Sequence, residues 1–266
     1  NPEVQRAMLH EQDPELLQSV SEFATKVYSC PPDPKHPELQ PRALMVGGFV
    51  RDALLGGHPK DADIEVLGLS PERLEELLDQ LFPGKVDRVG QQFGILKVKV
   101  SDTVEFDVSI PRSESKSGAG HKGFVTNSDP SMSVFEAARR RDFTWNALAA
   151  DVMTGEVFDH YGGIQDLKDK VLRVTDPERF KDDPLRVMRA VQFAARLDFK
   201  IEPQSLQLMK EMVTEGALNE LPSERITSEL EKLLLKAERP SIGFEAAREL
   251  GIIEKHFPEL HDLIDV

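Results

Sequence analysis

The chain has 266 residues, 39% of them hydrophobic and 30% charged, which is the balance of a globular protein with one large domain or two smaller ones. No apolar run approaches the ~20 residues of a membrane span, and no signal-peptide pattern is present, so we expect no membrane partner. Cys30 is the only cysteine, which excludes a disulfide framework and favours a reducing, cytoplasmic compartment. The net charge of −14 argues against a nucleic-acid partner unless basic side chains gather locally.

Three regions follow one another along the chain. Residues 14–28 have helical spacing and 30–41 are rich in proline, so we expect residues 1–42 to form a helical extension and a linker. Residues 43–175 mix short apolar segments with helical ones. From residue 176 onward the pattern is helical, with a first part over 176–238 and a second over 239–266. The fold class is therefore α+β: a mixed sheet with helices, followed by an all-helical part.

The mixed region can be divided into elements. Residues 43–46 predict a strand that runs into Gly47-Gly48, followed by a helix to about residue 55. A strand over 62–68 and a helix over 70–82 come next, with Ser70 as the N-cap. Residues 95–100 and 104–110 alternate strictly and predict two paired strands. Residues 111–133 are polar, contain glycine and lack periodicity, so we expect a long functional loop.

Asp61 and Asp63 are the first candidates for chemistry. Because side chains alternate along a strand, both carboxylates leave the same face, while Ala62, Ile64 and Val66 face the core. Two such acids form a seat for Mg²⁺, which serves phosphoryl and nucleotidyl transfer. A D-x-D pattern by itself more often marks a solvated strand face.

Gly47 and Gly48 lie between a strand and a helix, where glycine lets a phosphate approach the backbone. Arg51 follows one turn into that helix and could neutralise the same phosphates; the alternative is a tight turn with a surface arginine. Asp107 shares the polar face of its strand with Glu105 and Ser109. If that strand pairs with the D-x-D strand, Asp107 could join the metal site or act as a general base; otherwise it belongs to an ordinary polar face.

Two later segments combine acids with arginines. Arg140, Arg141, Asp142 and Asn146 could contact a triphosphate and a ribose, although Asp142 is also a suitable N-cap for a helix that begins at Phe143. Asp183 precedes Pro184 as an expected N-cap, yet Asp183 and Arg186 could together hydrogen-bond the Watson–Crick edge of a base. No pair of histidines has metal-ligand spacing.

These motifs in their order resemble the class II tRNA nucleotidyltransferases, the CCA-adding enzymes, and the related bacterial poly(A) polymerases. The resemblance covers residues 43–257 and rests on GGFVRDALLG…DAD, RRDFTWNA, GGIQDLKDKVLR…DDPLRVMRA and SERITSEL. FGILKV, which starts at Phe93, and PRSESKSG are closer to the CCA-adding branch. The family's architecture implies a polymerase-β-like head over 43–175, a helical neck over 176–238 and the start of a helical body over 239–266, with the family's tail not included.

The resemblance also implies roles. Asp61 and Asp63 would bind Mg²⁺, Gly48 and Arg51 the triphosphate, and Arg141 with Asp142 the phosphates and the ribose. Asp183 and Arg186, with Arg189 nearby, would select CTP or ATP, and the loop at 111–133 would take part in the switch from C to A addition. The implied reaction adds CMP and AMP from CTP and ATP to the tRNA 3′ end and releases pyrophosphate. The oligomeric state is left open.

Two positions depart from the family pattern. Asp182 replaces the usual glutamate, which we expect to matter little, and Gln192 replaces a frequent arginine, so one cationic contact to the nucleotide is expected to be missing. Within the family, CC-adding, A-adding and poly(A)-polymerising enzymes are alternatives. A non-catalytic protein that binds a nucleotide or RNA is the alternative from a different class.

Overall fold

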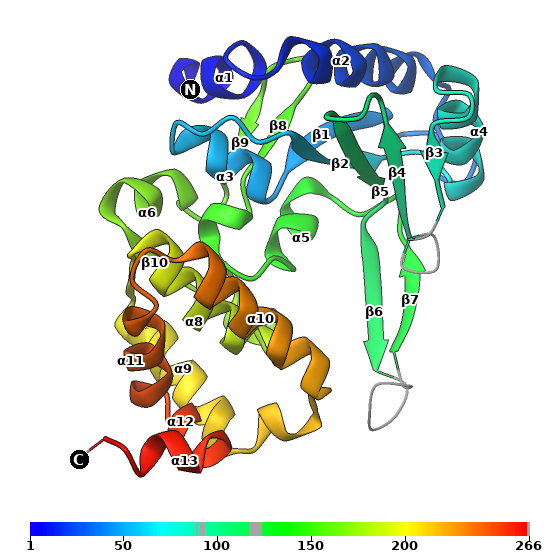
Figure 1. Cartoon of the computed structure of the whole chain (residues 1–266). Helices are drawn as coiled ribbons and strands as arrows, with labels where there is room; N and C mark the ends of the chain where they lie inside the picture. Colours follow the sequence, from blue (N-terminus) through cyan, green and yellow to red (C-terminus); the bar gives the residue numbers. More distant parts are fainter. Residues whose placement is uncertain (89, 91–93, 117–123, 265–266) are drawn as a thin grey trace. The chain divides into compact units, whose positions relative to one another are not determined.

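The computed structural model describes residues 1–88, 90, 94–116 and 124–264 (Figure 1). The chain forms two compact units. Unit 1 comprises residues Asn1–Arg139 and Trp145–Gly163, and unit 2 comprises Arg140–Thr144 and Ile164–Val266. Phe93 and the segment 117–123, both named in the sequence-based predictions, lie outside the described residues. Among the helices that the structure describes, none combines the length and hydropathy that a bilayer crossing requires.

Unit 1 is built on a seven-stranded mixed sheet. Its strands lie in the order β3 (Val86–Asp87), β4 (Ile95–Lys99), β5 (Glu105–Ser109), β2 (Asp61–Leu67), β1 (Arg42–Val46), β8 (Ala149–Asp151) and β9 (Val157–Phe158). Strands β2 and β5 are parallel, and the other neighbours are antiparallel. The predicted pairing of residues 95–100 with 104–110 is therefore confirmed.

One face of the sheet is the main core of unit 1. Ala62, Ile64 and Val66 of β2 are buried on it, as their alternation predicts. Helices α2 (Pro14–Ser29) and α4 (Pro71–Leu81) cover this face (Figure 1). Phe23 of α2 and Phe82, just after α4, both pack against Phe106 of β5, the first tilted and the second edge-on, with ring centroids 6.0 and 5.7 Å away. This packing fixes which side of β2 and β5 is left for polar side chains.

The N-terminal extension is an integral part of unit 1. Asp13 accepts hydrogen bonds from the N–H groups of Glu15 and Leu16, so α2 begins where the predicted helix does. A helix that the sequence did not predict, α1 (Pro2–Leu9), precedes it and packs against α3 (Gly48–Leu54), which matches the helix predicted to residue 55. Ser70 caps α4 by accepting from the N–H of Arg73, as predicted.

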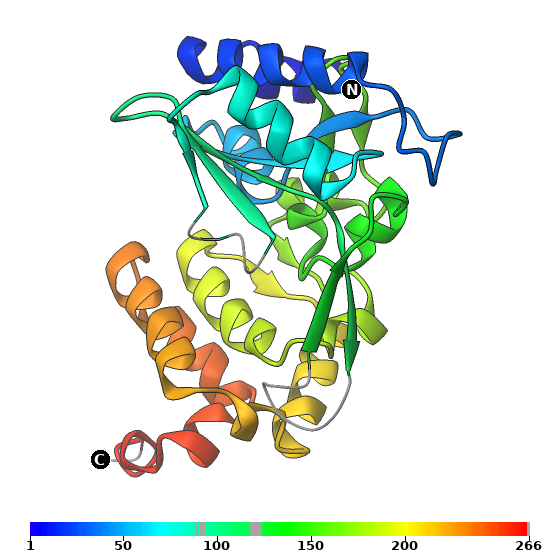
Figure 2. The ribbon, with the colours of Figure 1, turned by 90° about the vertical axis from the view of Figure 1, so that its right-hand side faces the viewer.

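The prediction of an irregular loop over residues 111–133 is wrong for its described part. Strands β6 (Arg112–Lys116) and β7 (Phe124–Ser128) pair antiparallel as a separate two-stranded ribbon (Figures 1 and 2). Helix α5 (Val134–Arg139) begins one residue after the predicted loop. The strands were hidden because β6 is entirely polar and the only apolar residues of β7, Phe124 and Val125, are adjacent, so neither strand shows apolar alternation.

The prediction of a helix that begins at Phe143 with Asp142 as its cap is also wrong. Phe143 instead makes a β-bridge with Val174, and a 3₁₀ turn, η3 (Thr144–Asn146), leads directly into β8. Asp142 accepts a hydrogen bond from the N–H of Phe143, its own neighbour, at 2.8 Å. The apolar residues after Phe143 are all buried, and a run without periodicity does not by itself separate a buried strand from a helix.

Unit 2 is mostly helical, as predicted. Its helices are α6 (Gly163–Asp169), α7 (Pro177–Phe180), α8 (Leu185–Leu197), α9 (Pro203–Thr214), α10 (Ser223–Lys236), α11 (Ser241–Glu249), α12 (Ile252–His256) and α13 (Pro258–His261), with a 3₁₀ turn η4 (Ala217–Glu220) and a short parallel pair of β10 (Val171–Leu172) and β11 (Lys200–Ile201). Helix α8 packs against both α10 and α11. Phe143 contacts Phe180 and Phe193 and so forms part of this core.

The compact units divide the chain differently from the predicted domains. The boundary lies between Gly163 and Ile164, and the RRDFTWNA motif is shared, with Thr144 in unit 2 and Trp145 in unit 1. Residues 176–238 and 239–266 fall within one unit. The boundaries of head, neck and body stay predictions.

Candidate functional site

The turn before α3 depends on two glycines. Gly47 has φ +70°, which side-chain-bearing residues rarely adopt. A Cβ on Gly48 would lie 3.1 Å from Nη2 of Arg51. The second glycine therefore leaves space for the arginine guanidinium to fold back over the start of its own helix.

Arg51 is buried, with 4% of its surface exposed, which excludes the alternative of a surface arginine at this turn. Its Nη1 donates to Oδ1 of Asn146 at 3.0 Å, its Nε donates to Oδ1 of Asp52 at 2.7 Å, and its guanidinium lies 5.8 Å from the ring of Trp145. The fold thus brings together two predicted nucleotide-binding residues, Arg51 and Asn146, which are 95 positions apart in the chain.

Carboxylates from β2 and β5 lie side by side on the polar face of the sheet. Asp61 and Asp63 of β2 are exposed, and their direct partners across the parallel pair are Glu105 and Asp107 of β5. Directly paired residues project to the same side, so the structure places Asp107 beside Asp63. The pairing of these two strands was the condition under which the sequence predicted that Asp107 could join the metal site. No group of three or more metal-ligating side chains is arranged around one point in the described ranges. That Asp107 joins the metal pair stays a prediction.

A lysine that sequence reasoning missed completes this face. Lys97 of β4 is the direct partner of Asp107 on its other side. Its Nζ lies 2.9 Å from Oε1 of Glu105 and 2.9 Å from Oδ1 of Asp107. Burial alone would lower the pKa of Lys97, but the hydrogen bond to Glu105 and the negative charges of Asp107 and Glu105 raise this pKa above its ordinary value. The strict alternation of ILKVKV was a signal, since it puts Lys97 on the polar face.

In unit 2, Asp142 and Arg189 form an ion pair. Nε of Arg189 donates to Oδ2 of Asp142 at 2.7 Å, and the carboxylate is buried. Burial opposes the charge of Arg189, but the charge and the hydrogen bond of Asp142 raise its pKa. Arg141, next to this pair, is partly exposed.

Asp183 and Arg186 are both fixed at the start of α8. Oδ1 of Asp183 accepts from the N–H of Leu185 at 3.0 Å, which is the capping role that the sequence predicted, and Oδ2 accepts from Arg225 at 3.0 Å. The guanidinium of Arg186 donates to the carbonyls of Arg179 at 2.5 Å and Arg140 at 2.6 Å. Arg225 lies in the SERITSEL motif, where the sequence predicted no role for any single residue.

The two departures from the family pattern occupy different surroundings. Gln192 is buried, with 1% of its surface exposed, and its Nε2 donates to Glu229 of α10 at 2.9 Å. Asp182 is partly exposed and lies 3.8 Å from Arg179. The amide of Gln192 therefore contributes to the contact between α8 and α10.

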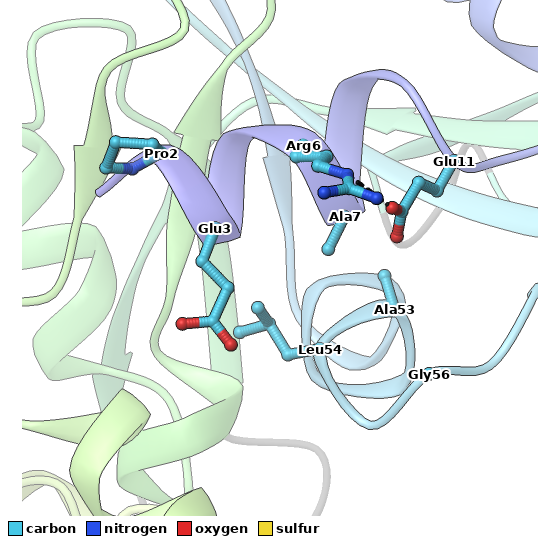
Figure 3. A pocket seen from close by; sticks show the side chains of 8 residues that line it. All are labelled: Pro2, Glu3, Arg6, Ala7, Glu11, Ala53, Leu54 and Gly56. Carbon is cyan, nitrogen blue, oxygen red and sulfur yellow. Dashed lines mark ion pairs between the residues drawn. The ribbon is translucent and has the colours of Figure 1, made fainter.

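A pocket elsewhere in unit 1 does not include the predicted site residues. It is an open hollow of about 450 Å³ between α1 and α3 (Figure 3). Arg6 and Glu11 pair at 2.7 Å on its rim. The residues that line it are Pro2, Glu3, Arg6, Ala7, Glu11, Ala53, Leu54 and Gly56.

Two family models match the chain. Residues 43–173 match the poly A polymerase head domain, and residues 198–264 match the probable RNA and SrmB-binding site of polymerase A. The first match includes the acidic face of unit 1 and the RRDFTWNA motif. The second covers α9 to α13 and includes Arg225.

Curated relatives and solved structures agree with these matches. The multifunctional CCA protein of Xanthomonas campestris pv. campestris (strain B100) is 40% identical over 228 residues, 85% of this chain and 53% of that protein. The Thermotoga maritima CCA-adding enzyme complexed with tRNA CCA superposes with a TM-score of 0.74 at 29% identity, over 96% of this chain and 56% of that one. A CCA-adding enzyme in complex with CTP gives a TM-score of 0.75 at 28% identity, with the same two coverages. The chain spans about half the length of the curated relatives it matches.

Proposed function

Because the chain belongs to the family that unites CCA-adding enzymes and bacterial poly(A) polymerases, we propose that it adds CMP and AMP from CTP and ATP to the 3′ end of tRNA. In this reaction the terminal 3′ oxygen forms a bond to the α-phosphorus of the nucleotide, and the bond from that phosphorus to pyrophosphate breaks. The observation that carries the proposal is the pair Asp61 and Asp63, exposed on one face of a strand whose other face is buried.

The donor set of this face fits Mg²⁺. Asp61 and Asp63 offer carboxylate oxygens, the ligands that this cation prefers, from a strand held rigid between two neighbours. When bound, Mg²⁺ supplies positive charge that offsets the charge developing on the phosphates. Asp107 is the third carboxylate of the site, next to Asp63.

The chain's own arginines and glycines bind the nucleotide in this proposal. Gly47 and Gly48 leave the backbone open to the triphosphate, and Arg51 with Asn146 supports that turn from within. Arg141 and Asp142 contact the phosphates and the ribose.

Asp183 and Arg186 select the base. A carboxylate and a guanidinium fixed by neighbouring groups lose little freedom on binding, which favours selective hydrogen bonding to a base edge. Arg189 contributes through its ion pair with Asp142. The segment 111–133 takes part in the change from C to A addition, as expected from the family resemblance.

The decisive assay uses tRNA that lacks its terminal CCA, with CTP and ATP, and the full-length protein. We expect incorporation by the wild type and by Asp102→Ala, which removes an exposed aspartate from a turn, and none by Asp61→Ala. Absence of incorporation by the wild type, with Asp61→Ala no worse, would end this proposal. A biological activity that survives loss of both Asp61 and Asp63 would point to the non-catalytic alternative.

Poly(A) synthesis is the second candidate, because the matched head-domain model carries the name of poly A polymerase. A reaction with ATP alone separates the two. Long ladders on generic RNA indicate poly(A) synthesis. A single A added only to tRNA that ends in CC indicates an A-adding or CCA-adding enzyme. In a second reaction with both CTP and ATP, C addition without subsequent A addition indicates a CC-adding enzyme.

A further inference from the structure

Lys97 stands in a row of charged residues that crosses four strands and begins with its direct partner Asp87 of β3. Lys97 of β4 is directly opposite Asp107 of β5, and Asp107 is directly opposite Asp63 of β2. Direct partners project to the same face, and neighbouring strands are about 4.8 Å apart. The ammonium is therefore two strands away from the proposed metal ligand Asp63, with Asp107 between them.

Lys97 contacts Asp107 from β4, and Asp63 lies on β2, on the other side of β5. Nζ of Lys97 is 2.9 Å from Oδ1 of Asp107 and 2.9 Å from Oε1 of Glu105. Oδ1 of Asp107 is itself buried, and among the described residues its contact with Nζ is an ion pair rather than a well-aligned hydrogen bond. One ammonium thus neutralises part of the charge of two carboxylates on this face.

From this arrangement we propose that Lys97 is a positioning residue that holds Asp107 in an ion pair, so that the nucleotide-free enzyme offers a divalent cation two carboxylates, Asp61 and Asp63, rather than three. The inference rests on the proposed function, because that function places the cation at Asp61 and Asp63. The described residues contain no three-ligand group, which agrees with a site of two carboxylates.

The physical consequence is weak binding of the cation before the nucleotide arrives. Mg²⁺ in phosphoryl-transfer sites is commonly held by one or two carboxylates together with substrate phosphates. A nearby ammonium also repels a divalent cation and competes for the oxygens of Asp107. The cation then enters together with the triphosphate, whose oxygens complete its coordination.

An ordinary surface salt bridge is the competing explanation. Side chains that are about one-third exposed, as these are, often form ion pairs of little energetic value. Such a pair would act on the cation only through the long-range repulsion of its positive charge. Its effect would then not depend on whether Asp107 can act as a ligand.

The test measures Mn²⁺ binding by electron paramagnetic resonance on the full chain without nucleotide or RNA. Lys97→Met removes the ammonium but keeps an unbranched stem, and we expect it to tighten Mn²⁺ binding on the order of tenfold. Asp107→Asn alone should change the affinity less than about twofold, and in the Lys97→Met background it should abolish the gain. Lys97→Arg should behave as the wild type does.

Lys99→Met is the matched control. Lys99 lies on the same face of β4, pairs with Asp87 at 3.3 Å and is 57% exposed. It measures the effect of losing one nearby positive charge, and we expect that effect to be smaller than that of Lys97→Met and independent of Asp107.

Three outcomes would contradict the inference, and one of them would also contradict the proposed function. The inference is overturned if Lys97→Met tightens Mn²⁺ binding equally with and without Asp107, or not at all. It is also overturned if Asp107→Asn weakens binding by the wild type as much as Asp61→Asn does. If Asp61→Asn itself has no effect on Mn²⁺ binding, the proposed metal seat fails, and with it both the proposed function and this inference.

Discussion

The guanidinium of Arg189 and the carboxylate of Asp142 are 2.7 Å apart, although the two residues are separated by 47 positions in the chain. This pair joins the RRDFTWNA motif to α8, the helix that also begins with Asp183 and Arg186. Asp142 is 7% exposed and the Arg189 side chain 31%. The pair is therefore buried on the carboxylate side and partly accessible on the other.

Loss of one partner should destabilise unit 2. Asp142→Asn leaves the guanidinium of Arg189 without its counter-charge, and we expect the free energy of unfolding to fall by about 2 kcal/mol, less than for a fully buried pair because the arginine is partly hydrated. The double variant Asp142→Asn/Arg189→Met should lose less than the sum of the single variants. Urea unfolding measures both, and additive losses would show that the two side chains do not interact.

Removal of Arg225 should affect nucleotide selection through Asp183. Arg225 donates to Oδ2 of Asp183 at 3.0 Å, and in its absence only the backbone contact to Leu185 orients this carboxylate. We expect Arg225→Ala to reduce discrimination of CTP and ATP against GTP and UTP in competition assays, with little change in stability. Arg239→Ala, which breaks an exposed pair with Asp198, is the control. Unchanged discrimination would separate Arg225 from the base site.

Lysine should not replace Arg186. The guanidinium of Arg186 donates to two backbone carbonyls at once. Because the guanidinium is planar, these two bonds also fix the direction of its remaining N–H groups, whereas lysine offers a single flexible ammonium. We expect Arg186→Lys to impair the choice of base more than the affinity for the triphosphate. Nucleotide competition and inhibition by inorganic triphosphate report the two effects. Arg196→Lys, near the end of the same helix, is the control, and equal loss in both assays would contradict a role in base selection.

The cap of α9 should make stability depend on pH. Glu202 caps this helix; burial would raise its pKa, but hydrogen bonds from Ser205 and Gln204 and the charge of Arg173 lower this pKa below its ordinary value. Because the pKa of Glu202 is lower in the folded state, its charge stabilises the protein at pH values above the unfolded-state pKa of about 4.5. This contribution is lost as the pH falls through the folded-state pKa.

The corresponding variant is Glu202→Gln. It should lower the free energy of unfolding by about 1 kcal/mol at pH 7 and by progressively less as the pH falls below 4.5. Urea unfolding at several pH values measures the difference. Glu249→Gln, an exposed position in α11, should show no such trend. A difference that is constant with pH would mean that the charge of Glu202 is not the stabilising element.

Local patterns predicted most elements of the fold and failed where the pattern was weak. Strict alternation located β4 and β5, helical spacing located α2, and Ser70 located the start of α4, because those signals act within a few residues. Strand β6 is entirely polar and β7 has only two adjacent apolar residues, so alternation could not reveal them. The buried run after Phe143 had no period and was mistaken for a helix.

The sequence by itself determined that Asp61 and Asp63 project from the same face of their strand, because side chains alternate along a strand. It also determined the family resemblance, because the order of the motifs is a property of the chain. Only the tertiary structure decided that Asp107 lies beside Asp63, that Lys97 pairs with Asp107, that Arg51 is buried against Asn146 and that Arg225 contacts Asp183. These contacts depend on strand register and on packing between distant segments, and a shift of one residue in register would send each strand's side chains to the opposite face.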